Sequence, residues 1–362
     1  MFAPSPETTA YSSRGALVWF VGEKTLKHAC KIGAAGIAAC LVVSAAEIDI
    51  KAQRLSDQPI LRPSQSWSEF GLFNPAAIKV DGKTVLLFRA QDRHQTSRIG
   101  YAETVDGTHF TVRPEPVLSP DAIYEANGGV EDPRVIEING TYYLTYTGYD
   151  LHSAQLCIAT STDLIHWERK GVILPAYKGT WNTKWTKSGA IVPVQIKGKW
   201  WMYYLGTRTD PDGKLRDYMG LASSDDLLHW RDATDKPVLD RRPGAFDSRV
   251  MEPGPPPFLT DAGILLLYNG ADEKLTYGPG WVLFDSQDPG RVIARADRPF
   301  VLPTLEWENV GNVPNVIFLE GAIVDSSSAT KNRLELTGYY GAADKYIGAL
   351  RILISTHPSA AK

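Results

Sequence analysis

A unit of roughly 60 residues recurs along the chain from about residue 70 onward, and this repeat limits the possible folds more than any other feature. Each copy contains a glycine, a strand-like run rich in aromatic residues, a polar break and a second short strand. A turn with the pattern Ser/Thr-x-Asp-Leu follows in the clearest copies. The copies begin near Gly82, Gly140, Gly198, Gly263 and Leu334.

The pattern within each copy predicts an all-β protein. Apolar and polar residues alternate with period two, and Gly, Asp and Asn separate the strand-like runs. Helical periodicity is nearly absent past residue 60. Repetition of such units favours blades around a common axis, so we predict a five-bladed β-propeller over residues 70–355. Residues 47–69 would be a leader strand or arm, and a series of β-sandwiches is the alternative fold.

The N-terminal region has the order of a secretory signal peptide. Residues 24–31 are basic, residues 32–46 are small and apolar, and the run ends in a small-x-small cleavage pattern. We predict removal of residues 24–46 and a periplasmic or extracellular protein, with residues 1–23 an extension from an upstream start codon. The run is short for a membrane span, so none is expected in the mature form. A buried helix is one alternative, and a lipoprotein attached at Cys40 is another.

Cysteine content and charge exclude several classes of function. The cysteines are Cys30, Cys40 and Cys157, and removal of the signal peptide leaves only Cys157. An intrachain disulfide or a cysteine metal site is then impossible, and Cys157 is expected in the core. The net charge of -3 gives no indication of a nucleic-acid surface. His, Asp and Glu show no metal-ligand spacing, so we predict no metal and no cofactor.

Residues 128–134 carry the most concentrated chemistry of the chain. Two glycines permit a tight turn, and the adjacent carboxyls Glu131 and Asp132 follow. Pro133 and Arg134 then lead into a strand-like run. A loop that enters a strand can aim its side chains into a cleft. The alternative is a turn in which Asp132 caps backbone amides and pairs with Arg134.

Several of the repeated strands end in aspartate. In a propeller the innermost strands converge on a central funnel, so these residues predict an acidic ring at one mouth: Asp92, Asp150, Asp272 and Asp344. Carboxylates accept hydrogen bonds from sugar hydroxyls, and aromatic rings stack on the apolar faces of sugars. Trp181, Trp185 and Trp307 are candidates for stacking, although each could equally belong to the core. The predicted ligand is therefore an oligosaccharide.

Short motifs in a fixed order resemble those of glycoside hydrolase family 130, the mannoside phosphorylases and related hydrolases. They cover about residues 70–350 and are Phe73-Asn74-Pro75-Ala76, Ser97-Arg98-Ile99-Gly100, Gly129-Val130-Glu131-Asp132-Pro133-Arg134, Gly254-Pro255-Pro256, Asn312-Val313-Pro314-Asn315-Val316 and Tyr339-Tyr340-Gly341-Ala342-Ala343-Asp344. The resemblance implies a five-bladed β-propeller, which agrees with the repeat. It also implies β-mannosides as substrates.

The resemblance implies that Asp132 is the proton donor, which reaches the glycosidic oxygen through a hydroxyl of the sugar in the first subsite. An acid must be protonated near the working pH, so we expect the pKa of Asp132 to be raised, and Glu131 could help by like-charge repulsion. The residues implied to bind the sugar are Arg89, Asp92, Ser97, Arg98, Glu131 and Asp344.

The attacking group decides between hydrolysis and phosphorolysis. Lys187 is a basic residue where phosphorylases have one, but Asn269 stands where they usually have His, and the carboxylate Glu252 appears beside Arg249. We therefore predict an inverting exo-glycosidase with Asp132 as general acid and Glu252 as base, whose carboxyls lie roughly 6.5–9.5 Å apart. The predicted export agrees, because phosphorolysis conserves energy mainly inside the cell.

Three alternatives stay open at this point. The first is a β-mannoside phosphorylase, in which Lys187 and Arg249 would bind inorganic phosphate as the co-substrate. The second is a non-catalytic sugar-binding propeller, which would not need both Asp132 and Glu252. The third concerns Glu252 alone, which could be a structural ion-pair partner of Arg249.

Overall fold

The structure is a computed structural model that describes residues 47–325 and 333–357. The expected signal peptide, with Cys30 and Cys40, lies outside the described residues, so the export of the chain stays a prediction. The domain boundaries proposed from the sequence likewise stay predictions. Within the described residues, no helix is long and apolar enough to cross a membrane.

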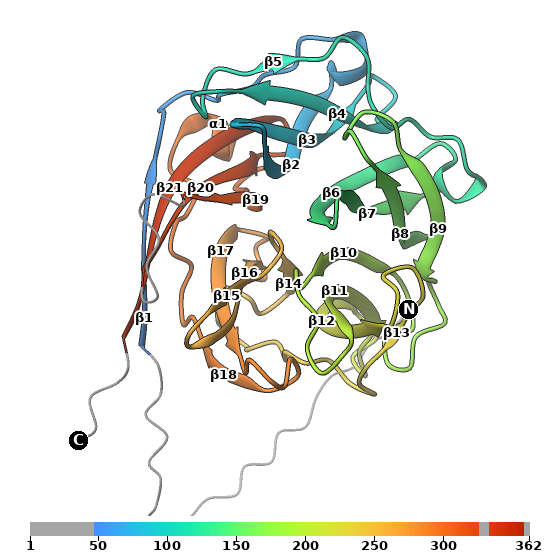
Figure 1. Ribbon diagram of the computed structural model, residues 1–362, viewed down its shortest axis with the longest axis vertical. Coiled ribbons are helices and arrows are strands. Elements are labelled where there is room, and N and C mark those ends of the chain that lie inside the picture. Colours follow the sequence, from blue (N-terminus) through green and yellow to red (C-terminus); the bar gives the residue numbers. More distant parts are fainter. Residues whose placement is uncertain (1–46, 326–332, 358–362) are drawn as a thin grey trace, which may run out of the picture. The chain divides into compact units, whose positions relative to one another are not determined.

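Five antiparallel sheets surround a common axis, and the strands nearest the axis are β2, β6, β10, β14 and β19 (Figure 1). The first sheet contains β2 (Gly71–Val80), β3 (Lys83–Gln91), β4 (Ser97–Thr104) and β5 (Thr111–Val112). The second contains β6 (Gly129–Ile138), β7 (Thr141–Tyr149), β8 (Ala154–Ser161) and β9 (Glu168–Leu174). A parallel bridge between Ser97 and Gly129 joins these two blades.

The third sheet contains β10 (Thr186–Ile191), β11 (Trp200–Thr209), β12 (Leu215–Ser224) and β13 (Trp230–Asp232). The fourth contains β14 (Val250–Pro253), β15 (Phe258–Thr260), β16 (Gly263–Ala271), β17 (Tyr277–Phe284) and β18 (Val292–Arg295). The fifth contains β19 (Ile317–Val324), β20 (Arg333–Ala342) and β21 (Tyr346–His357). The described helices are only η1 (Ser66–Ser68), η2 (Ile123–Glu125) and α1 (Glu306–Asn309). The all-β, five-bladed propeller is confirmed.

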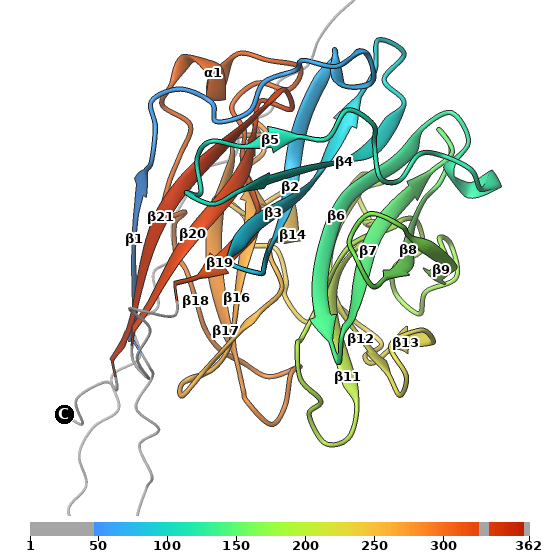
Figure 2. The same ribbon diagram turned by 45° about the horizontal axis from the view of Figure 1, so that its top comes forward.

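Strand β1 (Glu47–Arg54) closes the ring of blades. It pairs antiparallel with β21 along its whole length, so the fifth blade combines the two ends of the described chain (Figure 2). Arg54 then ties this strand to the loop before the fifth blade, because its guanidinium binds both carboxylate oxygens of Glu308 at 2.7 Å. The edge strand of the last blade is thereby covered by a segment that precedes the first blade.

Apolar packing between neighbouring blades forms the core. One cluster joins the second, third and fourth blades through residues such as Leu156, Met202 and Tyr268. Another joins the fourth and fifth blades, and two more flank the first blade. Cys157 is a free, buried cysteine in one of these clusters, as expected. Burial of this kind is worth about 25 cal/mol per Å² of apolar surface, so blade contacts dominate the stability.

The repeated Ser/Thr-x-Asp-Leu turn is a structural cap. Asp163 accepts backbone N–H bonds from Ile165 and His166, and its other oxygen lies 2.7 Å from Nδ1 of His166. Asp226 makes the same set of contacts in the next blade. These aspartates satisfy the amides of a tight turn at the outer end of each blade. They have no part in the site at the axis.

Candidate active site

Each innermost strand carries a polar residue followed by Pro or Gly at an equivalent place. The five pairs are Asn74-Pro75, Asp132-Pro133, Ser188-Gly189, Glu252-Pro253 and Glu320-Gly321. In four of the five blades the strand register shifts at this place, which marks a β-bulge. A bulge inserts an unpaired residue and re-aims its side chain. Asn74, Asp132 and Ser188 accordingly have φ of 49°, 49° and 59°, a region that Asn and Asp tolerate well.

Two side chains hold one oxygen of Asp132. The Asn74 amide donates to Oδ1 at 2.8 Å, and Nη1 of Arg89 lies 3.2 Å from the same oxygen. Asp132 is only 4% exposed. Its Oδ2 makes no hydrogen bond to any described residue, and this leaves one oxygen free to face a ligand.

Glu131 belongs to a second set of bonds beside Asp132. Nη2 of Arg89 lies 2.6 Å from Oε1 of Glu131, and the Ser97 hydroxyl donates to that oxygen at 3.1 Å. Nε of Arg89 donates to the Ser97 hydroxyl at 3.0 Å, while its guanidinium lies 4.9 Å above the ring of Phe73. Arg89 therefore holds both adjacent carboxylates, and Glu131 in turn helps to hold Arg89 and Ser97 in place.

The tight turn before these acids needs its glycine. Gly129 has φ of 107°, and a Cβ there would lie 2.2 Å from the carbonyl oxygen of Ser97. A larger residue would push the first and second blades apart at the point where Ser97 meets Glu131. The glycine thus permits the close approach that places Asp132 beside Arg89.

A cavity of about 170 Å³ lies at this end of the axis. Its lining residues are Asn74, Arg89, Asp132, Lys187, Glu252, Tyr277, Val313, Val316, Phe318 and Asp344. They come from all five blades and their loops, so the propeller brings together residues up to 270 positions apart. Glu252 is buried, and the Ser188 hydroxyl donates a hydrogen bond to its Oε1.

The pKa of Asp132 contradicts the expectation from the sequence. Burial alone would raise it, but the charges of Arg89 and Lys187 and the hydrogen bond from Asn74 outweigh burial and hold it below its ordinary value. In the free site Asp132 is therefore a carboxylate at neutral pH. The neighbour that was expected to raise this pKa, Glu131, instead has its own raised by burial.

Two other carboxyls of the cavity have raised pKa values. Burial raises the pKa of Glu252, against the opposing charge of Lys187. Burial, together with the charges of Asp132 and Glu131, raises the pKa of Asp344 to about 7 despite the opposing charge of Arg89. Several carboxyls in one small space cannot all ionise cheaply. The cavity thus stores at least one exchangeable proton beside Asp132.

Lys187 is the cation of the cavity that remains available. Burial works against its charge, but Glu252 and Asp132 raise its pKa above the ordinary value, so it stays protonated. It makes no ion pair or hydrogen bond with the part of the chain that the structure describes. An ammonium held in this way can receive an anion or sugar hydroxyls.

The predicted acidic ring is wrong for three of its four members. Asp92, Asp150 and Asp272 each accept backbone N–H bonds within a tight turn, and none lines the cavity. Asp92 also pairs with Arg98 at 2.8 Å, which occupies both residues with one another. Only Asp344 lines the cavity. A strand-end aspartate serves its own turn unless the strand delivers it to the axis.

The candidates Arg249, Asn269 and Trp181 do not line the cavity. Arg249 is exposed and does not line the cavity, and no ion pair joins it to Glu252 within the described chain. Asn269 is buried and binds both backbone groups of Leu319, at 2.9 and 2.8 Å, so it joins two blades. Trp181 is a core residue that packs on Tyr204.

The remaining tryptophans lie outside the cavity. Trp185 donates to the Tyr177 hydroxyl at 3.3 Å. Trp307 stacks on Tyr340 with a centroid distance of 5.9 Å and lines a separate surface groove with Tyr346. The stacking role proposed for Trp185 and Trp307 stays a prediction.

Sequence reasoning missed Asn74, Ser188, Tyr277 and Glu320. Alignment of the first strand of each repeat would have found three of them, because each precedes a Pro or Gly as Asp132 does. Tyr277 carries no such signal, since it enters the cavity from the start of β17, the third strand from the axis in the fourth blade. For metals, the described residues contain no group of three or more potential ligands.

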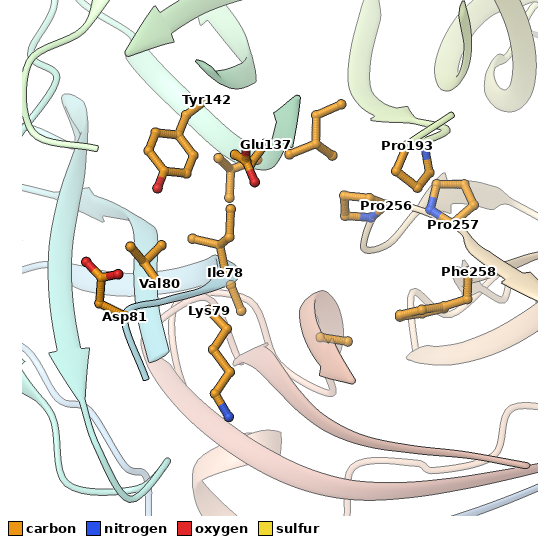
Figure 3. Close-up of a pocket in the computed structure, with 14 residues that line it drawn as sticks. Ile78, Lys79, Val80, Asp81, Glu137, Tyr142, Pro193, Pro256, Pro257 and Phe258 are labelled. Carbon is orange, nitrogen blue, oxygen red and sulfur yellow. The ribbon is translucent and has the colours of Figure 1, made fainter. Parts of the chain in front are cut away.

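A second cavity of about 530 Å³ lies where the innermost strands end (Figure 3). Its wall combines Ile78 and Val80 of β2 with Tyr142, Pro256 and Phe258. Charged groups there are confined to Lys79, Asp81 and Glu137. It contains none of the paired acid and cation groups of the first cavity, so we assign the chemistry to the first.

Comparison with known proteins gives matches to mannoside phosphorylases. Residues 70–356 match a family model described as beta-1,4-mannooligosaccharide phosphorylase. A 1,2-beta-oligomannan phosphorylase of Thermoanaerobacter sp. (strain X514) is 38% identical, over 83% of this chain and 96% of the relative. A beta-1,2-mannobiose phosphorylase of the same organism is 33% identical, over 82% of this chain and 95% of its own.

Solved structures agree with these relatives. A structure from work on GH130 glycoside hydrolases that target beta-1,2 mannosidic linkages in Candida mannan has a TM-score of 0.71 and 31% identity, over 86% of this chain and 94% of its own. The beta-1,2-mannobiose phosphorylase of Listeria innocua, in complex with beta-1,2-mannobiose, has a TM-score of 0.70 and 26% identity, over 83% and 96% of the two chains.

Proposed function

The chain belongs to glycoside hydrolase family 130, and we propose that it cleaves β-1,2-linked mannosides by phosphorolysis, with Asp132 as the proton donor. The enzyme class follows from the family. The linkage is supported by the relatives named above, which act on beta-1,2-mannosides or oligomannan. The same relatives favour the phosphorylase alternative over the hydrolase that the sequence motifs suggested.

One observation carries the phosphorolytic route. Lys187 is charged, lines the cavity together with Asp132, and makes no hydrogen bond or ion pair with any described residue, although the charges of Glu252 and Asp132 act on it. Inorganic phosphate is the co-substrate of this route, and a phosphate dianion beside Lys187 would cancel much of the field that now lowers the pKa of Asp132. Binding of phosphate would therefore help to load Asp132 with the proton that it must donate.

The proton would come from within the same cavity. Asp344, whose pKa is raised to about 7, can hold a proton near neutral pH, and burial also raises the pKa of Glu252. A sugar that fills the cavity expels water and links these groups through its hydroxyls. Asp132 then gives a proton toward the leaving oxygen while the phosphate oxygen attacks the anomeric carbon from the opposite face, which inverts its configuration.

Hydrolysis is the second candidate, and the position of Glu252 favours it. A carboxyl with a raised pKa lines the same cavity as the acid, so Glu252 could take the proton of an attacking water. In that case Lys187 would bind a substrate hydroxyl. One of the similar structures comes from work on β-1,2-specific hydrolases of this family.

Product analysis with β-1,2-mannobiose separates the two routes. Phosphorolysis requires inorganic phosphate and yields mannose 1-phosphate, whereas hydrolysis proceeds without phosphate and yields only mannose. Lys187→Met should raise KM for phosphate about 10-fold or more, while Lys199→Met, which removes an exposed ammonium paired with Asp225, should not. Phosphate-independent release of mannose that depends on Glu252 would establish the hydrolase instead.

A further inference from the structure

Arg134 is buried directly behind the cavity and binds backbone from two blades. Its side chain is 1% exposed. Nη1 donates to the carbonyl oxygen of Asp132 at 3.2 Å, Nη2 to that of Pro253 at 2.6 Å and Nε to that of Gly254 at 3.0 Å. One guanidinium therefore connects the acid of the second blade with the two residues that follow Glu252 in the fourth.

These bonds act on the backbone that aims the two carboxyls. Asp132 has a positive φ within its bulge, so its peptide plane is set by the bulge and by whatever holds its carbonyl. Arg134 holds that carbonyl from two residues further along. The segment after Glu252 packs closely against neighbouring backbone, because a Cβ on Gly254 would lie 2.7 Å from the Leu319 carbonyl oxygen.

The Arg134 guanidinium is satisfied mainly by its hydrogen bonds to three carbonyl oxygens, and less by its ion pair with Glu320. Its nearest carboxylate is Oε1 of Glu320, at 3.4 Å, and neither oxygen of Glu320 accepts a hydrogen bond from any described group. Burial raises the pKa of Glu320 well above its ordinary value. The guanidinium fork suits three carbonyls in fixed directions, which a lysine ammonium cannot reproduce.

We propose that Arg134 is a positioning residue that fixes the separation of the Asp132 and Glu252 carboxyls across the propeller axis. It does not line the cavity. Its effect on the reaction passes through the backbone of the residues that do. This inference rests on the proposed mannoside-cleaving function only for its kinetic readout.

Replacement of Arg134 by lysine and by glutamine tests the proposal. Arg134→Lys keeps the charge and loses the fork, so kcat should fall about 100-fold while KM for β-1,2-mannobiose stays within about threefold. Arg134→Gln should lower kcat further. Arg134→Lys should keep a higher kcat than Arg134→Gln, because lysine retains the positive charge and can donate one hydrogen bond. The matched control is Tyr203→Phe, which removes one buried bond between blades, to the Pro289 carbonyl at 2.9 Å; neither residue lines the cavity.

Crystal structures of the variants give a readout without turnover. In Arg134→Lys the 2.8 Å bond from Asn74 to Asp132 should lengthen or break, because the Asp132 peptide is released. Failure of the wild-type protein to cleave β-1,2-mannobiose, with or without phosphate, would reject the proposed function but not this displacement. Unchanged Asp132 and Glu252 positions, or kcat equal to that of Tyr203→Phe, would overturn the positioning role. So would failure of both Arg134 variants to fold, because Arg134 would then serve stability alone.

Discussion

Asp344→Asn should make the protein's stability less sensitive to alkaline pH. The Asp344 carboxyl lies in a cavity with Asp132 and Glu252, and burial, together with the charges of these residues and of nearby Glu131, raises its pKa from 3.8 to about 7. The folded state therefore binds a proton that the unfolded chain releases between these two values. Stability from this group is fully present below about pH 4 and is lost as pH rises through 7.

The magnitude follows from the difference in pKa. A difference of about 3 corresponds to about 4 kcal/mol, since each factor of ten in proton affinity is worth about 1.4 kcal/mol. Asp344 is half-buried rather than enclosed, so screening by water reduces the effect to about 2–4 kcal/mol. For a cooperative unit of roughly 300 residues this is about 3–6 °C in Tm. The asparagine variant carries no such charge and should lack this loss.

Thermal unfolding of both proteins between pH 4 and 9 measures the effect. Tm of Asp344→Asn minus Tm of the wild type should rise by about 3–6 °C across this range. Asp106→Asn is a control that should show no such rise between pH 4 and 9, because backbone N–H groups of His109 and Thr108 lower the pKa of Asp106. There the wild type should lose its advantage only as pH falls below about 4. A Tm difference for Asp344→Asn that does not change with pH would refute the reasoning.

Three further results are expected. Asp132→Asn should lower turnover about 10²–10⁴-fold with the protein still folded, and activity near that of the wild type in a steady-state assay would remove Asp132 from the mechanism. Arg54→Met should lower the free energy of unfolding by about 2–4 kcal/mol in thermal unfolding, because Glu308 is left buried without its cation; an unchanged Tm would mean that this ion pair does not stabilise the closure of the ring. Glu320→Gln should gain stability relative to the wild type as pH rises from about 5 to 9, since the raised pKa of Glu320 disfavours its ionised form in the folded state; denaturation at several pH values would show no such trend if Glu320 were ionised and well paired.

Much of the cavity could be predicted from the sequence. Arg89, Asp132, Lys187, Glu252 and Asp344 were all singled out as site candidates, and all five line it. Asp132 and Asp344 lie in the short motifs that carry the family resemblance, whereas Arg89, Lys187 and Glu252 were singled out as charged residues at positions compared with the family. The carboxyls were visible as residue types, but their protonation was not. The pKa of Asp132 is lowered by cations that approach it from other blades, which no local motif records.

The errors have a common physical cause. Asp92, Asp150 and Asp272 end strands as Asp344 does, yet each is consumed by the amides of its own turn. An aspartate at the same place in the repeat can thus become a cap or a ligand-facing group. The outcome depends on whether the turn lies at the axis, and that is a property of the assembled ring.

The sequence by itself determined the all-β class, the number of blades and the residue types available for chemistry. Period-two alternation and a repeat of roughly 60 residues are local, and the chain alone suffices to express them. Only the tertiary structure decided which residues meet. Strand β1 closes the last blade, the bulges turn Asn74, Asp132 and Glu320 away from their strands, and Arg134 joins carbonyls about 120 residues apart. These contacts arise because closure of five sheets around one axis brings the same position of every blade to the same point in space.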